Sequence, residues 1–193
     1  IKPGTNAQVS LNWYQVLTKT VNEIPVYVFR SINPSPTMLI LAGLHGGACN
    51  GIEIVRRLIT RDDVKKPVCG SIIAIPVINI ISFLSGTRDL PDGRDLNRCF
   101  PGSKAGSLGS RIAYDLMNEI IPQIDFGVDF HTGGAKINNY PQLRCIFNNK
   151  INLDLGKKFS PPLILNSPFR DNTLRKEAAK KGKTNAPELG SSL

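Results

Sequence analysis

Long apolar runs are missing from this sequence of 193 residues. The longest, such as residues 38–42, are far shorter than the roughly 20 residues that a membrane-spanning helix needs. The first residues also lack the apolar stretch behind a basic start that marks a secretory signal. We therefore expect a cytoplasmic protein that has no membrane as a partner.

Cysteine pairs are missing as well. The four cysteines, at positions 49, 69, 99 and 145, form no C-x-x-C motif, which argues against a zinc ribbon or a thioredoxin site. Scattered single cysteines are typical of a reducing compartment, where they act as small hydrophobic residues. We expect these four side chains to be reduced and buried.

Acidic residues are outnumbered by basic ones, and the net charge is +9. Such an excess is compatible with nucleic-acid binding. However, the basic residues are spread along the chain, apart from residues 175–176 and 180–183, and no RNA-binding motif or zinc finger accompanies them. We interpret the charge as a solvated basic surface that attracts a small anionic substrate, and we expect no nucleic-acid partner.

Hydrophobic periodicity predicts strands that alternate with helices. This alternation is typical of the α/β class, so we predict three layers, with a mixed central sheet flanked by helices, in one domain over residues 1–193. An amphipathic helix is expected from Leu108 to Ile121, with Ser107 as its N-cap, and a long loop from Ser82 to Ser107. The expected strands cover residues 8–16, 25–29, 38–44, 71–77, 127–131, 143–147 and 162–165, and the other expected helices cover residues 50–60, 153–159 and 171–181.

The only two histidines, His45 and His131, each follow a predicted strand directly. Ligands of open α/β sheets bind at the carboxyl ends of strands, and imidazole is a common zinc ligand. The two rings could therefore meet at one edge of the sheet. Asp129 precedes His131 by two residues on the same side of the strand, and it could orient an imidazole. A histidine at a strand end can also be an ordinary core residue.

The loop over residues 88–102 is dense in Arg, Asp and Asn. Arginine offers a planar fork for a carboxylate, and near a metal it can stabilise an oxyanion. The alternative is an ordinary polar surface loop, but the length without periodicity favours a function.

Three motifs together resemble the succinylglutamate desuccinylase/aspartoacylase branch of the zinc carboxypeptidases. Residues 44–58 are similar to its first metal motif, residues 95–98 (Asp-Leu-Asn-Arg) to its next signature, and residues 129–133 to its last metal motif. The resemblance implies a zinc carboxypeptidase-like fold that binds one Zn²⁺. It also implies hydrolysis of a non-peptide amide bond in a small N-acyl amino acid or a similar acylated amine.

The resemblance also implies roles for single residues. His45 and His131 would be zinc ligands, and Arg88 would polarise the scissile carbonyl and stabilise the oxyanion. The carboxylate of the substrate would bind to Asn97 and Arg98. The general base that activates water would be Glu188. Family members usually continue into a smaller β-rich domain, and we expect this domain to be absent here.

One metal ligand of the family pattern is missing. The family has Glu three residues after the first His, and this position is Ala48 here; the Asp before it is Gly47. A methyl group binds no metal, and catalytic zinc usually has three protein ligands. Glu53 is the nearest carboxylate downstream, but we do not expect it to replace the ligand. The alternative function is therefore a non-catalytic relative that binds an anionic small molecule or a protein partner.

Overall fold

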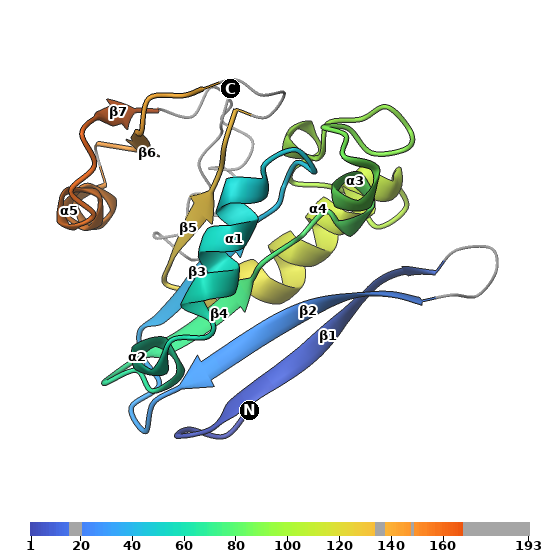
Figure 1. Ribbon diagram of the computed structural model, residues 1–193. Helices are drawn as coiled ribbons and strands as arrows, with labels where there is room; N and C mark the ends of the chain where they lie inside the picture. Colours follow the sequence, from blue (N-terminus) through green and yellow to red (C-terminus); the bar gives the residue numbers. More distant parts are fainter. Residues whose placement is uncertain (16–20, 134–137, 148, 168–193) are drawn as a thin grey trace.

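The computed structural model describes residues 1–15, 21–133, 138–147 and 149–167 (Figure 1). Its main feature is a five-stranded sheet with the order β1-β2-β4-β3-β5. The neighbours β4, β3 and β5 run parallel, whereas β2 pairs in antiparallel fashion with β1 on one side and with β4 on the other. The strands are β1 (Asn6–Gln15), β2 (Val21–Arg30), β3 (Thr37–Ala42), β4 (Ser71–Ile75) and β5 (Phe126–Phe130).

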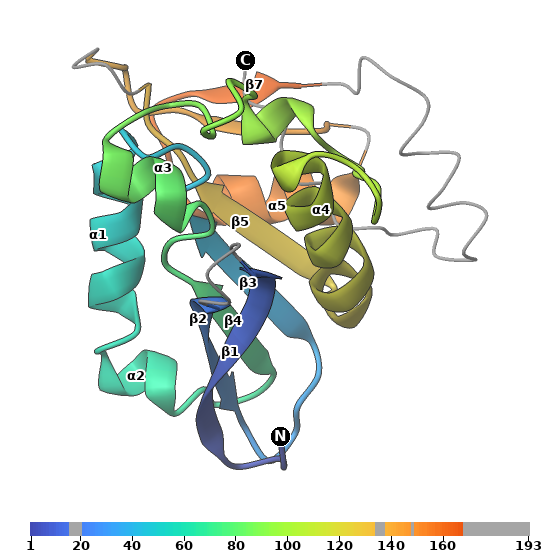
Figure 2. The same cartoon turned by 90° about the vertical axis from the view of Figure 1, so that its right-hand side faces the viewer.

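Helices cover both faces of this sheet. Alternate residues of β3 face opposite sides: Leu39 and Leu41 join the larger core cluster, and Ile40 and Ala42 join the smaller one. The larger cluster includes Ile112 from α4 (Leu108–Asp115), and the smaller one includes Val55 from α1 (Cys49–Leu58). Figures 1 and 2 show α1 and α4 on opposite sides of the strands. The predicted three-layer α/β fold is confirmed.

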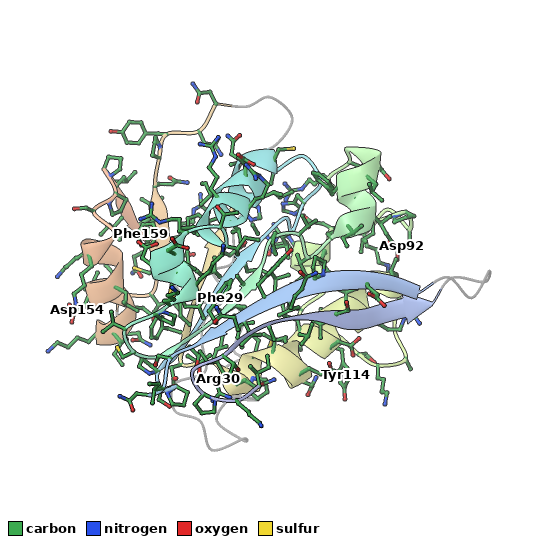
Figure 3. The ribbon with its side chains drawn as sticks, turned by 60° about the horizontal axis from the view of Figure 1, so that its bottom comes forward. Phe29, Arg30, Asp92, Tyr114, Asp154 and Phe159 are labelled. Atoms are coloured by element: carbon green, nitrogen blue, oxygen red, sulfur yellow. The ribbon has the colours of Figure 1, made fainter. Side chains whose placement is uncertain are left out.

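A smaller unit lies beyond β5. It consists of the parallel strands β6 (Leu143–Cys145) and β7 (Ile164–Asn166) with helix α5 (Lys150–Lys158) between them in the chain. The rings of Phe130, on β5, and Phe159, after α5, contact each other with centroids 6.1 Å apart. Figure 3 shows Asp154 and Phe159 on one side of the molecule and Asp92 on the other.

Several short helices differ from the predicted pattern. The expected loop from Ser82 contains most of helix α3 (Ile80–Ser85) and the 3₁₀ turn η1 (Leu96–Arg98), and helix α2 (Asp62–Lys65) was not predicted. Ser107 caps α4 as expected, but a π-helical turn η2 (Leu116–Ile120) and a 3₁₀ turn η3 (Ile121–Gln123) replace its second half. The helix predicted over residues 171–181 lies outside the described residues.

Two further predictions concern the burial of the cysteines and the lack of a membrane-spanning helix. All four cysteines are free, but Cys49 and Cys69 are exposed, so the prediction that all four are buried is wrong. Cys49 lies at the start of α1 and Cys69 lies in a turn. Neither is on the apolar face of a helix or strand, which explains why both are exposed. Within the described residues, no helix has the length and apolar character needed to cross a membrane.

Candidate active site

His45 lies on a short loop that leaves the end of β3. The loop is fixed by hydrogen bonds from its backbone: the Asn79 side-chain amide donates to the Leu44 carbonyl at 3.2 Å, and the Gly46 N–H donates to the Thr87 carbonyl at 3.0 Å. Gly46 packs so closely that an added Cβ would lie 1.8 Å from the Ser82 carbonyl oxygen. The result is a histidine with only 2% of its surface exposed.

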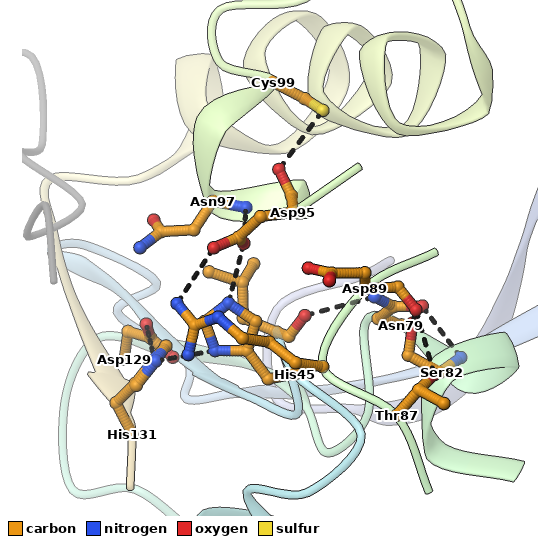
Figure 4. A network of polar contacts seen from close by, with 12 residues as sticks. His45, Asn79, Ser82, Thr87, Asp89, Asp95, Asn97, Cys99, Asp129 and His131 are labelled. Carbon is orange, nitrogen blue, oxygen red and sulfur yellow. Dashed lines mark hydrogen bonds and ion pairs between the residues drawn. The ribbon is translucent and has the colours of Figure 1, made fainter. Parts of the chain in front are cut away.

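His131 follows β5, which is the parallel neighbour of β3. Because Ala42 and Phe130 are register partners, the two chains leave the sheet side by side. The Nδ1 atom of His45 lies 2.9 Å from Nε2 of His131, and the rings are nearly perpendicular at 89° (Figure 4). The prediction that the two histidines meet at one sheet edge is confirmed.

Each imidazole ring contacts a carboxylate through the nitrogen that does not face the other ring. His45 Nε2 lies 2.7 Å from Asp95 Oδ1, and His131 Nδ1 lies 3.2 Å from Asp129 Oδ2. The expected contact of Asp129 with an imidazole is thus present, and its second oxygen, Oδ1, is buried without a hydrogen-bond partner. The role of Asp95 was missed by the sequence analysis, although its position before Leu96 is that of an N-cap.

The contacts that link Asp95, His45, His131 and Asp129 need more N–H donors than two neutral imidazole rings provide. The three contacts Asp95–His45, His45–His131 and His131–Asp129 each need one N–H. Two neutral imidazoles offer only two, since each has one donor and one acceptor nitrogen. Either an added proton or a metal ion held by Nδ1 of His45 and Nε2 of His131 would remove the deficit, because both rings could then donate to their carboxylates. The two nitrogens therefore suit a metal ion that prefers imidazole.

Neither residue 48 nor Glu53 supplies a third ligand for such a metal. Ala48 is 1% exposed, and its N–H donates to the His45 carbonyl at 3.1 Å. Glu53 points to the exposed side of α1, where Arg56 and Arg57 bind its carboxylate at 2.6–2.9 Å. Among the residues with described coordinates, no three His, Cys, Asp or Glu side chains form a group that could hold a metal ion.

Burial and charge set the protonation of the inner pair. Burial lowers the pKa of His45 from its usual value of 6.5, against the opposing effect of Asp95. Burial alone would raise the pKa of Asp95, but hydrogen bonds from His45, Asn97 and Arg88 bring it below its usual value. At neutral pH the site therefore contains a neutral His45 beside an ionised Asp95.

Arg88 reaches the same carboxylate from the solvent side. One guanidinium nitrogen lies 2.8 Å from Asp95 Oδ2, and 43% of the side chain is exposed. Hydrogen bonds hold its neighbours: Thr87 Oγ1 and Ser82 Oγ both donate to the Asp89 carbonyl, at 2.9 and 3.0 Å. Arg88 thus contacts the carboxylate that binds His45, and its side chain is open to a ligand.

The remaining predicted site residues follow Asp95 in the chain or lie at the C-terminus. The backbone N–H of Asn97 donates to Asp95 Oδ1 at 2.9 Å. Asn97 is half-buried, and Arg98 is exposed in the same turn, η1. The structure thus brings His45, His131, Arg88 and Asn97 together, whereas Glu188 lies outside the described residues.

Comparisons with known proteins agree with this geometry. Residues 34–191 match the succinylglutamate desuccinylase/aspartoacylase catalytic domain. The sequence is 34% identical over 122 residues to N-alpha-acetyl-L-2,4-diaminobutyric acid deacetylase of Halomonas elongata. The matched region covers 61% of this chain and 34% of that protein.

Solved structures with the same fold include three that cover nearly the whole chain. An aspartoacylase family protein from Mesorhizobium loti has a TM-score of 0.75 and 25% identity, over 96% of this chain and 60% of that one. A succinylglutamate desuccinylase/aspartoacylase from Rhodobacter sphaeroides has a TM-score of 0.73 and 27% identity, over 96% and 57%. The product-bound ectoine utilization protein EutE (DoeB) from Ruegeria pomeroyi has a TM-score of 0.74 and 25% identity, over 98% and 61%. The chain thus spans less than two thirds of each of these proteins.

Proposed function

The chain belongs to the succinylglutamate desuccinylase/aspartoacylase family, and we propose that it is a metal-dependent amide hydrolase. Its proposed reaction is the removal of the acyl group from a small N-acyl amino acid or a similar acylated amine. One observation carries the proposal: two histidines, each backed by a carboxylate, face each other beside an arginine that binds one of these carboxylates. Four free cysteines suit the cytoplasmic location that we also propose.

We assign the metal position to the two facing nitrogens, Nδ1 of His45 and Nε2 of His131. Zinc bound there would supply a Lewis acid that polarises a carbonyl and acidifies water. Asp95 and Asp129 would keep the two rings oriented toward the ion, as carboxylates commonly do for ligating histidines.

The proposed substrate contacts come from the loop that follows α3. Arg88 is the candidate for the developing oxyanion, because its guanidinium is exposed and lies next to the histidines through Asp95. Asn97 and Arg98 are the candidates for the carboxylate of the substrate, since both lie in the turn after Asp95. Glu188 remains our proposal for the general base.

The nature of the relatives suggests which substrate to test first. The Halomonas elongata relative is named for deacetylation of N-alpha-acetyl-L-2,4-diaminobutyric acid, an N-acyl amino acid. A binding surface for the anionic carboxylate of such a molecule is consistent with the net charge of +9. We therefore propose a small, anionic, acylated amino acid as substrate.

The test is a hydrolysis assay with zinc added. Purified protein is incubated with N-acetyl-2,4-diaminobutyrate and a panel of N-acetyl and N-succinyl amino acids, and the released amine is quantified. We expect zinc-dependent release that is abolished in His131→Gln. Release that is equal in the wild type and the variant, or no release from any substrate of the panel, contradicts the proposal.

A second candidate function is a non-catalytic binding protein for the same anionic ligands. The specific observation in its favour is Ala48, a buried methyl group where the family has a ligand carboxylate. Calorimetric titration with the same panel separates the two: binding without turnover in the presence of zinc supports the second candidate, and turnover supports the first.

A further inference from the structure

A hollow of about 490 Å³ opens at the end of the sheet opposite the candidate active site. Its walls come from residues 4 and 6, from residues 30–33 at the end of β2, and from residues 65–68 after α2. The last two segments lead into β3 and β4, whereas His45 follows β3. Figure 1 shows α2 and α3 at opposite ends of the strands. The six residues of β3, roughly 20 Å of extended chain, therefore separate the hollow from His45.

Hydrogen bonds hold the walls of the hollow together. The Ser31 N–H donates to the Gly70 carbonyl at 3.0 Å, and the Gly70 N–H donates to the Asn33 carbonyl at 2.8 Å. The side-chain amide of Asn6 donates to the Lys65 carbonyl at 2.9 Å. Each wall is thus tied to another segment of the chain. The hollow is pre-formed, as small-molecule sites usually are.

The charged side chains that line the hollow are all cations. They are Arg30, Lys65 and Lys66, and Arg30 and Lys65 are half-buried. Arg30 donates to the carbonyl of Ile1, which is a neutral acceptor. Within the part of the chain that the structure describes, no carboxylate forms an ion pair with any of the three. Clustered cations in a concave surface give a positive potential that attracts an anion.

Apolar side chains border the same hollow. Ile32 is 82% exposed and Val68 is 99% exposed, and Pro67 lies beside Val68 in the lining. A single exposed apolar residue is normal on a protein surface, but here two of them flank one cationic hollow. The aliphatic stems of the lysines add further apolar surface. The lining therefore suits a ligand that has both an anionic group and an apolar chain.

We propose that this hollow is a second binding site, which takes a small organic anion with an apolar chain, such as a medium-chain carboxylate. The carboxylate binds to the three cations, and the chain covers Ile32 and Val68. The volume lies within the roughly 300–1,000 Å³ that is common for small-molecule sites. The site is separate from the proposed hydrolase centre and needs no turnover there. The competing explanation is an ordinary solvated basic surface.

Titration with hexanoate tests the site directly. The probe is added to the ¹⁵N-labelled, metal-free chain, and ¹H–¹⁵N correlation spectra are recorded. We expect the amide signals of residues 30–33 and 65–70 to shift, while those of Gly46 and His131 stay in place. Each CH₂ group removed from water strengthens binding by about fourfold, so acetate should bind at least about tenfold more weakly than hexanoate. Hexanol, which lacks the charge, should cause no comparable shifts.

Two variants separate the roles of charge and apolar surface. Lys66→Gln should weaken hexanoate binding by roughly 1.5–5-fold, the range expected for an exposed charge pair. Val68→Ser should weaken it by roughly two- to tenfold through loss of apolar contact. Lys158→Gln and Ile151→Ser are the matched controls, because both positions are exposed on α5, outside the hollow. Lys66 and Val68 are themselves exposed, so all four variants should keep the thermal midpoint of the wild type.

Several results would overturn the proposal. Absence of shifts on addition of hexanoate, or equal affinity for hexanoate and acetate, leaves only a solvated basic surface. The same holds if Lys66→Gln and Val68→Ser bind hexanoate as tightly as their controls do. Shifts centred on Gly46 and His131 would place the anion in the candidate active site instead. Sedimentation of the protein with phosphatidylglycerol vesicles, without hexanoate binding, would assign the surface to a membrane and contradict a small-molecule site.

Discussion

Asp129 and His131 lie two residues apart at the end of β5, with 3.2 Å between Oδ2 of the carboxylate and Nδ1 of the ring. Residues at this spacing are on the same side of a strand, so the backbone alone brings them together. The contact leaves Nε2 of His131 facing His45. The orientation of this ring, like that of His45, therefore depends on a carboxylate.

Asp129→Asn should weaken zinc binding by roughly 10–100-fold, because the amide holds the ring less firmly than the carboxylate does. Zinc competition with a chelating dye measures the effect. Asp154→Asn, an exposed position on α5, is the control and should bind zinc as the wild type does. Unchanged affinity in Asp129→Asn would show that the orientation of His131 does not depend on this contact.

Ala48→Glu should raise zinc affinity by at least about tenfold, because it restores a third ligand to a site with two histidines. The same dye competition measures it. Ala48→Gln has nearly the same size and lacks the charge, so it controls for the steric effect of a longer side chain at a buried position. Equal affinity in both variants and the wild type means that residue 48 does not face the metal position.

Arg98→Ala should weaken the binding of N-acyl amino acids by roughly 10–150-fold, which corresponds to the loss of a charge-assisted hydrogen bond of about 1.5–3 kcal/mol. Calorimetric titration measures the affinity, and the thermal midpoint should stay nearly unchanged because Arg98 is exposed. Arg94→Ala removes an exposed arginine of the same loop and should leave affinity unaltered. A large loss of thermal stability would instead mark Arg98 as a structural residue.

The pKa of His45 predicts a loss of stability in mild acid. Burial lowers this pKa below 6.5, so the unfolded chain takes up a proton at a higher pH than the folded chain does. Stability is therefore full above about pH 7 and falls as the pH drops through 6.5 toward the folded pKa. Urea unfolding between pH 7.5 and 5 should show a steeper decline in the wild type than in His45→Gln. Parallel curves would rule out His45 as the source.

The parts of the site that follow from strand periodicity could be predicted from the sequence. His45 and His131 follow buried strands that are parallel neighbours, and Asp129 lies two residues from His131, so simple geometry predicts both contacts. Their role as metal ligands stays a prediction. The same periodicity predicted the central strands β3, β4 and β5 within a few residues.

The contacts of Asp95 depend on loop conformation, which has no period. They require the turn between Leu90 and Arg94 and the 3₁₀ turn η1, and neither leaves a repeating pattern in the sequence. Helix α3 was missed because it is only six residues long, although Asn79 caps its start and Gly86 ends it in a left-handed conformation. These two caps were the available signal.

Zinc content is the most direct test of a metal site between His45 and His131. The wild type, His45→Gln and His131→Gln are loaded with zinc, dialysed mildly and analysed for zinc per chain. The account predicts close to one zinc per chain in the wild type and essentially none in either variant. A wild type without zinc, or variants that retain as much zinc as the wild type, would contradict it.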